Sequence, residues 1–429
     1  NFVLPDNLGF TSFNKKARMS DNIGALKLIA TLKKENRSAS QKEQEILSKY
    51  VGWGGLKVVY NNEAVEWTKA DEELRPLFGE LEKAIDELEN LGFSNLKRGI
   101  KQSVDTAFYT PTPLIKSIYS AIQSFGFKHG NILDPSAGIG HFFGAMPTSI
   151  RNKSRLTSVE LEPLTAFINK QLYPNTTNYN TGYENARLQN NNFDLVVSNI
   201  PFGNFAVSDK TFNSPELSSL QNQIHNYFFA KAIQQTKEGG LIAFITTSGT
   251  MDTKGNSNIR EYINKNTEFI GALRLPNSTF SDNAGTSVVS DLIFLKKNTG
   301  EKNNTDFNTI VEIDLNNKSG TKETPISVNK YFIDNPSHVI GKLISDTNQF
   351  AKNVMNVIPN ENANISEQIN SVISSSFPKN IYQNQSTYAQ KNTIEEIANS
   401  VDIKENEIYI GTDGKAYKSN GIDTEPTPI

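Results

Sequence analysis

The tetrapeptide Asn199-Ile200-Pro201-Phe202 carries groups suited to hold a flat ring with an exocyclic amine. It follows the apolar run 193–198, which is typical of a buried strand. The Asn199 side-chain oxygen and the Ile200 carbonyl can both accept hydrogen bonds from one amine, and Phe202 can stack on the ring. The same pattern is also common in structural turns. The tetrapeptide therefore predicts a ring-binding pocket if neighbouring motifs support it.

A glycine-containing loop upstream has the composition of a ligand-binding turn. It follows the short apolar run 131–133 and precedes the expected helix 141–146. Glycines at a strand-to-helix turn let a ligand approach the backbone, although the alternative is a tight structural turn. An acid stands at the strand end instead of the glycine of dinucleotide folds, which suits a ligand with a positively charged amine. The loop residues expected to line a binding site are Asp134, Pro135, Ser136, Ala137, Gly138 and Gly140.

Two further carboxylates follow expected strands. Glu160 ends the run 156–160, where an acid can accept hydrogen bonds from ribose hydroxyls. Glu184 lies after the next expected strand, where its carboxylate can receive an adenine amine. Each also has a plain interpretation as an exposed glutamate near a strand end.

The elements around these motifs predict an α/β fold. Short, nearly continuous apolar runs are typical of parallel strands covered on both faces, and they occupy 131–133, 156–160, 193–198, 241–245 and 269–273. Residues 223–237 predict a helix, which Gly239-Gly240 should end. Residues 267–274 and 287–297 leave no room for a crossover helix and should pair antiparallel. We expect a Rossmann-like, seven-stranded, mostly parallel sheet with an antiparallel hairpin at one edge.

The pattern of apolar and polar residues divides the chain into three regions. Residues 1–103 are expected to be helical, with apolar Ile23, Leu26, Ile29 and Ala30 at helical spacing. Residues 104–300 carry the α/β pattern and the motifs. Residues 301–429 form a C-terminal extension, a candidate DNA-recognition or linker region, whose stretch 355–395 is polar enough to be partly disordered.

Composition narrows the classes of protein. The 429 residues include no cysteine, which excludes disulfides, thiolate zinc sites and cysteine nucleophiles, and no metal site is expected. No apolar stretch reaches the length of a membrane span, so the simplest location is the cytoplasm. The net charge of −3 does not by itself indicate a nucleic-acid-binding protein, although local lysine and arginine clusters can form a basic face. The absence of an initial Met favours a processed product or a piece of a longer protein.

The ordered motifs resemble those of class I S-adenosylmethionine-dependent N6-adenine DNA methyltransferases. Phe108-Tyr109-Thr110-Pro111 comes first, followed by the glycine loop, the strand-end glutamate and the tetrapeptide. The resemblance implies that Tyr109 and Thr110 contact the methionine end of the cofactor. It further implies that Asp134 binds the cofactor amine, Glu160 its ribose, and Asn199 with Phe202 a flipped adenine. S-adenosyl-L-methionine is the implied cofactor and DNA the implied substrate.

Further motifs over residues 8–297 are similar to the methylase region of very large proteins of bacterial mobile elements and phages. These motifs include 13–18, 50–56, 225–228, 247–252 and 274–276. Such proteins often join a methylase to a helicase and are linked to DNA modification, restriction-modification or antirestriction. The resemblance implies a bacterial cytoplasmic enzyme that can belong to a larger polypeptide or complex.

Ile200 departs from the commonest form of the motif, Asn-Pro-Pro-aromatic. The chemistry there needs a backbone carbonyl, so isoleucine should preserve it. The same variant occurs in ribosomal-RNA adenine dimethyltransferases, so an RNA adenine methyltransferase stays an alternative. A transferase acting on a protein glutamine is another. A further alternative, of a different class, is a non-catalytic DNA-binding or antirestriction module of a larger protein.

Overall fold

The computed structural model describes residues 1–5, 14–54, 56, 72–100, 109–280, 288–298, 307–346, 354–383, 408–410, 416–418 and 427–428. Residues outside these ranges include Phe108, Gly55 and the stretch 284–286, so the parts of the predicted motifs that they form lie outside the described residues. The chain splits into two compact units, one formed by 1–186 with 190–382 and the other by 187–189 with 383–429. The first unit holds the sheet and the helices around it.

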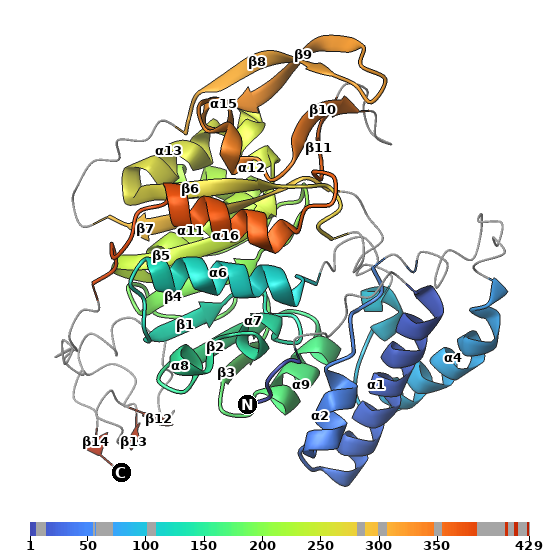
Figure 1. Cartoon of the computed structure of the whole chain (residues 1–429). Coiled ribbons are helices and arrows are strands. Elements are labelled where there is room, and N and C mark those ends of the chain that lie inside the picture. Colours follow the sequence, from blue (N-terminus) through green and yellow to red (C-terminus); the bar gives the residue numbers. More distant parts are fainter. Residues whose placement is uncertain are drawn as a thin grey trace. The chain divides into compact units, whose positions relative to one another are not determined.

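A seven-stranded sheet forms the centre of the first unit (Figure 1). Its strands are β1 (Asn131–Asp134), β2 (Arg155–Glu160), β3 (Thr177–Asn180), β4 (Phe193–Asn199), β5 (Thr236–Thr247), β6 (Thr267–Leu275) and β7 (Ser290–Lys297), in the order β3-β2-β1-β4-β5-β7-β6. Strands β1 to β5 pair in parallel, whereas β7 is antiparallel to both β5 and β6. The predicted mostly parallel α/β sheet with an antiparallel edge pair is confirmed.

The glycine pair near the start of β5 has a different role from the predicted one. Helix α11 (Ile224–Gln235) already ends at Gln235, and Gly239 and Gly240 lie inside β5. The β4–β5 register shifts here, since Phe193 pairs with Thr236 but Leu195 with Leu241. Gly239 has φ +72, a conformation that glycine tolerates best. The pair therefore forms an irregularity in the strand instead of a helix end.

Helices cover both faces of the sheet. Phe294 of β7 contacts Phe125, which follows α6 (Thr112–Ser124), at a ring separation of 5.4 Å. Phe244 of β5 contacts Phe229 of α11 at 5.2 Å. Because Phe294 pairs with Ala243, the next residue Phe244 points to the opposite face. Helices α6 and α11 thus lie on opposite faces of the sheet. The other α-helices between β1 and β6 are α7 (His141–Gly144), α8 (Thr148–Arg151), α9 (Pro163–Leu172), α10 (Pro215–Ser219), α12 (Gly249–Asp252) and α13 (Ser257–Asn266).

The N-terminal region is helical, as predicted, in its described parts. It contains α1 (Lys15–Glu35), α2 (Gln41–Leu47) and α4 (Arg75–Asn90). The four apolar positions predicted to share a face of α1 are all buried. Helix α2 starts with a capping box between Ser40 and Glu43. Gln44 of α2 donates a 2.7 Å hydrogen bond to the carbonyl of Gln171 in α9, which links α2 to α9.

The polar stretch predicted to be partly disordered is ordered over residues 354–383. It forms β11 (Val354–Ile358) and α16 (Ile365–Ser376), and α16 packs on α6. Phe377 stacks on Phe125 with ring centroids 6.4 Å apart, and Tyr382 N donates to Phe125 O at 2.7 Å. The remaining elements of this part are β8 (Ile310–Asn316), β9 (Lys322–Asn329), α15 (Lys330–Asp334) and β10 (Lys342–Asp346). Ile369 and Ile373, one helical turn apart in this polar sequence, are buried, whereas residues 384–395 of the same stretch lie outside the described residues.

The second unit contains the small antiparallel sheet β12 (Ile408–Ile410), β13 (Ala416–Lys418) and β14 (Thr427–Pro428).

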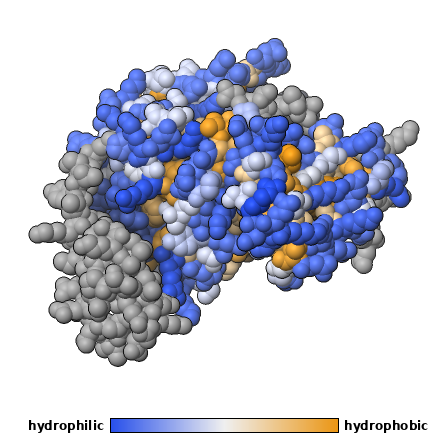
Figure 2. All heavy atoms as spheres, turned by 90° about the horizontal axis from the view of Figure 1, so that it is seen from below, coloured by the Kyte–Doolittle hydropathy of each residue, from blue (hydrophilic) through white to orange (hydrophobic). Residues whose placement is uncertain are grey.

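The face of the protein in Figure 2 is mostly hydrophilic, with hydrophobic residues in small areas. Among the described residues, no helix is both long and apolar enough to cross a membrane. The predicted region boundaries at 103 and 300 stay predictions.

Candidate functional site

Three of the predicted site residues end neighbouring parallel strands. Glu160, Asp134 and Asn199 are the last residues of β2, β1 and β4, which are adjacent in the sheet. Because the carboxyl ends of parallel strands meet at one edge, these side chains are brought to the same edge. This is the position where α/β sheets bind ligands, next to the switch in strand order between β1 and β4.

Asp134 is fully buried and only partly paired. Its Oδ1 accepts hydrogen bonds from Ser198 Oγ at 2.7 Å and from Ser136 N at 3.2 Å. Within the described part of the chain, Asp134 Oδ2 and the nearby Tyr119 Oη are buried and have no hydrogen-bond partner. Burial raises the pKa of Asp134 to about 7, and the hydrogen bond from Ser198 opposes that rise. An incompletely paired buried carboxylate suits a cationic ligand.

The glycine loop is held open by its backbone conformation and by neighbours. Gly138 and Gly140 have φ +54 and +90, in the left-handed region. A methyl group on Gly140 would lie 2.3 Å from Tyr173 Cε2, so no larger residue fits there. Asn169 Nδ2 donates to Gly138 O at 3.1 Å. The shape of the turn between β1 and α7 is therefore fixed by its glycines and by side chains of the α9 region.

Glu160 connects the glycine loop to the start of α9. Its Oε2 accepts a hydrogen bond from Gly138 N at 2.8 Å, and its Oε1 accepts one from Glu162 N at 2.9 Å. Burial raises the pKa of Glu160 to about 7, and the charge of Glu162 adds to the rise. Glu162 caps α9 by accepting from Leu164 N and Thr165 N. Each Glu160 oxygen retains acceptor capacity for a ligand hydroxyl.

Tyr109 and Thr110 lie over the glycine loop. The Tyr109 ring meets the His141 ring edge-on, with centroids 5.1 Å apart. A methyl group on Gly138 would lie 3.3 Å from Tyr109 Cε1, so the ring borders the loop. Thr110 is buried, and its backbone lies against His141. Burial lowers the pKa of His141 to about 4, which leaves a neutral ring at pH 7.

Glu184 lies further from a strand end than the other two acids. It follows β3 by several residues, in the turn 182–186, and accepts a 2.7 Å hydrogen bond from Asn185 Nδ2. Its charge acts on Tyr227 and Lys231 of α11. Glu184 therefore lies near enough to α11 for its charge to be felt there, whereas Glu160 is hydrogen-bonded to the glycine loop.

The tetrapeptide divides into a buried and an accessible part. The Ile200 side chain is buried, and its N–H donates to Ile245 O at 3.1 Å, which continues the β4–β5 pairing. Pro201 and Phe202 are half-buried, and the Phe202 ring meets Phe280 edge-on at 6.5 Å. Because its side chain is in the core, Ile200 can face a ligand only with its backbone.

A buried ion pair braces the loop that follows the tetrapeptide. Asp209 Oδ2 accepts hydrogen bonds from Lys231 Nζ and Tyr227 Oη, both at 2.6 Å. Asp209 Oδ1 accepts from Thr211 N and Oγ1 at 2.9 and 2.6 Å. Burial raises and these hydrogen bonds lower the pKa of Asp209, with a net lowering. The loop is thus anchored to α11 at a charged and fully hydrogen-bonded point.

Several residues around the site had no signal in the sequence. Ser198 reads as the last member of an apolar run, yet it donates to Asp134. Asn169 and Tyr173 of the α9 region shape the glycine loop from far along the chain. Only their place in the fold gives these residues a role.

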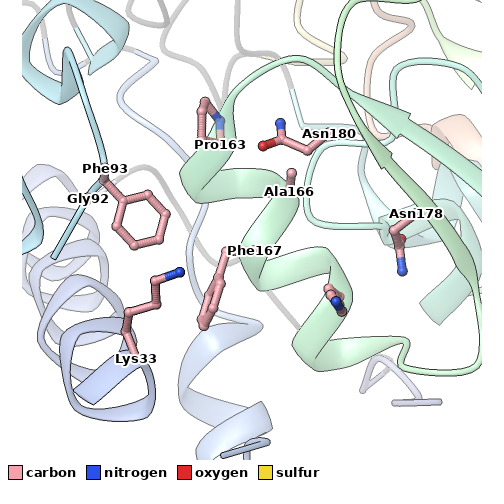
Figure 3. A pocket seen from close by; sticks show the side chains of 9 residues that line it. Lys33, Gly92, Phe93, Pro163, Ala166, Phe167, Asn178 and Asn180 are labelled. Atoms are coloured by element: carbon pink, nitrogen blue, oxygen red, sulfur yellow. The ribbon is translucent and has the colours of Figure 1, made fainter. Parts of the chain in front are cut away.

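A separate groove lies on the outer side of α9 (Figure 3). Its cavity volume is about 350 Å³, and Phe93 and Phe167 meet edge-on in it at 5.8 Å. Lys33 of α1 lies 5.5 and 5.9 Å from the two ring centroids. None of the predicted site residues lines this groove. No group of three or more histidine or acidic residues that could hold a metal ion occurs in the described ranges.

The strand order, with one antiparallel strand, and the acids at the ends of β1 and β2 define a class I methyltransferase fold. The family described as N-6 DNA Methylase matches residues 100–415, and the chain belongs to this family. Members of the family use S-adenosylmethionine. The resemblance stated from the sequence motifs is confirmed.

Sequence identity between this chain and individual known proteins is low. Defense against restriction protein B of Escherichia phage P1 is 30% identical over 205 residues, which are 47% of this chain and 9% of that protein. The chain thus spans a small part of that relative. The methyltransferase subunit of a type I restriction-modification system from Streptococcus thermophilus is 16% identical, with TM-score 0.41, over 82% of this chain and 74% of that one. A protein assigned to the class I S-adenosylmethionine-dependent methyltransferases of Listeria monocytogenes is 17% identical, with TM-score 0.42, over 68% and 91%.

Proposed function

We propose that the chain transfers a methyl group from S-adenosylmethionine to the N6 amino group of adenine in DNA. The observation that carries this proposal is the meeting of Asp134, Glu160 and Asn199 at one sheet edge, with hydrogen bonds joining two of them to their neighbours. Family membership supports methylation of DNA in general. The site residues supply the adenine-specific part of the argument.

The residues around the glycine loop fit the cofactor. S-adenosylmethionine supplies the methyl group when it is bound. The open oxygen of Asp134 would be a partner for its ammonium group, and Tyr109 and Thr110, which contact His141 after the glycine loop, would contact its methionine end. Glu160 can accept ribose hydroxyls in addition to its two backbone hydrogen bonds. Glu184 is the proposed acceptor for the adenine amine of the cofactor.

The tetrapeptide fits the target base. Asn199 Oδ1 and the Ile200 carbonyl would accept the two N6 hydrogens, which directs the nitrogen lone pair toward the methyl group. Phe202 would stack on the ring, with the adenine flipped out of the duplex. After transfer, the proton from N6 passes to solvent, so no strong base is needed. Alignment of the reacting atoms can contribute about 7–11 kcal/mol.

The remaining regions are assigned by position. Residues 1–103 would support the catalytic region 104–300, and residues 301–429 would contribute to DNA recognition. Because the match to the phage P1 protein spans only 9% of that protein, we place this chain within a larger methylase/helicase polypeptide or complex.

Methylation assays with two variants test the proposal. The wild-type chain should transfer labelled methyl groups to DNA from a methylation-free host, but not to RNA or protein. Asn199→Ala should lose this transfer and keep cofactor affinity in calorimetric titration, whereas Asp134→Ala should lose both. Equal labelling by wild type and a folded Asn199→Ala variant would refute the assigned pocket.

A second candidate function is a non-catalytic module that protects DNA against restriction. The similarity to Defense against restriction protein B favours it. In that case the folded chain would bind DNA and protect it from cleavage without labelling it. Protection that persists in Asp134→Ala would support this alternative and oppose the enzymatic one.

A further inference from the structure

The loop after the tetrapeptide presents an aromatic ring to solvent. Phe205 is 50% exposed, and it is the single aromatic residue among the exposed large hydrophobic residues of the described chain. The others are Val3, Ile46, Leu161 and Ile333. Isolated exposed hydrophobic residues are common, so exposure alone assigns no role to Phe205. Its surroundings give the reason to look further.

The Phe205 ring lies directly against the backbone next to Phe202. A methyl group built on Gly203 would lie 2.4 Å from Phe205 Cε1 and 2.7 Å from its Cδ1. The ring therefore covers the Gly203 α-carbon, and a side chain at residue 203 would displace it. On the same backbone segment, His225 lies beside Gly203. The position of Phe205 is thus set by the segment that carries Phe202.

The loop that carries Phe205 is anchored on its far side. Val207 N donates to Gln221 O at 2.9 Å, and Asp209 N donates to Gln221 Oε1 at 2.6 Å. The buried Asp209–Lys231 ion pair fixes the same point to α11. A half-exposed ring on a loop anchored in this way is preorganised for contact with a flat partner.

We infer that Phe205 stacks on a base of the DNA that flanks the target adenine. This inference rests on the proposed function, because Phe202 marks the target pocket. Stacking on an aromatic ring tolerates any base, so Phe205 would add affinity without reading sequence. Phe202 would hold the flipped base, and Phe205 would hold a base that stays in the strand. Phe205 is therefore a substrate-contacting residue outside the predicted motif.

DNA binding by the full 429-residue chain tests the inference. Fluorescence anisotropy with a labelled duplex should show that Phe205→Ala weakens binding by about fivefold to about a hundredfold, the range expected for loss of one stack. Phe205→Trp should retain wild-type affinity. Ile46→Ala, which removes a similarly exposed hydrophobic side chain from α2, should change nothing. S-adenosylmethionine affinity and urea unfolding should be the same for all four proteins.

The same variants separate this inference from the proposed function. In methylation assays, Phe205→Ala should raise KM for DNA by a similar factor and leave kcat nearly unchanged. Wild-type DNA affinity and KM in Phe205→Ala would overturn the role of Phe205, even if Asn199→Ala confirmed the methyltransferase. DNA binding that depends on Phe205 without any methylation would overturn the proposed function and leave the stacking contact in place. A chain that binds no DNA would overturn both.

Discussion

Replacing Ser198 with alanine should make cofactor binding strongly pH-dependent. The Ser198 hydroxyl donates a 2.7 Å hydrogen bond to buried Asp134, and such a bond to a charged group contributes about 1.5–3 kcal/mol. Its loss disfavours the carboxylate, so the pKa of Asp134 should rise from about 7 to between about 8 and about 9. At pH 7 the ionised fraction then falls from about one half to between roughly one tenth and one hundredth. Affinity for the cationic cofactor should fall by about fivefold to about fiftyfold.

Calorimetric titration with S-adenosylmethionine at pH 7 and pH 9 checks this result. At pH 9 most of the wild-type Asp134 is ionised, and the Ser198→Ala variant should recover to within about twofold. Ser158→Ala is the matched control, because Ser158 is equally buried and lies opposite Asp134 in β2 but bonds to Asn178. Its affinity should not gain a pH dependence. Equal losses at both pH values, or no loss at pH 7, would refute the assigned role of Asp134 ionisation.

Two further substitutions test the packing around the site. Arg274 makes two 2.9 Å hydrogen bonds to Asp291 and a 2.8 Å ion pair with Asp252, which is also buried. Arg274→Met should therefore lower the free energy of unfolding in urea by about 3–5 kcal/mol. A loss below about 1 kcal/mol would contradict this prediction. Gly140→Ala should destabilise the protein by about 2 kcal/mol or more, because Gly140 has φ +90 and an added methyl group would meet Tyr173. Gly79→Ala in α4, where no atom lies within 4 Å of the added methyl group, should instead stabilise the protein by about 0.5–1 kcal/mol. Equal effects of the two glycine substitutions would show that backbone strain is absent at Gly140.

Most of the sheet could be predicted because its central strands are apolar runs between recognisable turns, whereas the edge strand β3 is polar. Strands buried on both faces leave a signal that does not depend on long-range partners. Helix α16 left a weak one, since its two buried isoleucines stand in a segment rich in serine and pack in the fold near α6, which is distant in the sequence. Gly239 and Gly240 were misread as a helix end because a strand irregularity and a helix terminus use the same residue type.

The candidate site was predictable where a residue type at a strand end already limits the chemistry. Asp134, Glu160 and Asn199 each stand at such an end. Their supporting groups were not predictable, because Ser198, Asn169 and the Asp209–Lys231 pair act across distances in the chain that only the fold closes. The sequence therefore indicates the polar groups that end the strands before it indicates the groups that support them.

The packing of α16 on α6 has a consequence for how the protein is made. Phe125, at the end of α6, is covered by Phe377 and Tyr382, roughly 250 residues further along the chain. At about 5–20 residues per second, a ribosome needs on the order of 10–50 s to synthesise that interval. During this time the nascent chain carries an apolar helix face with its final partner still missing. The packing around α6 is therefore expected to be completed late, only after residues 365–382 have been synthesised.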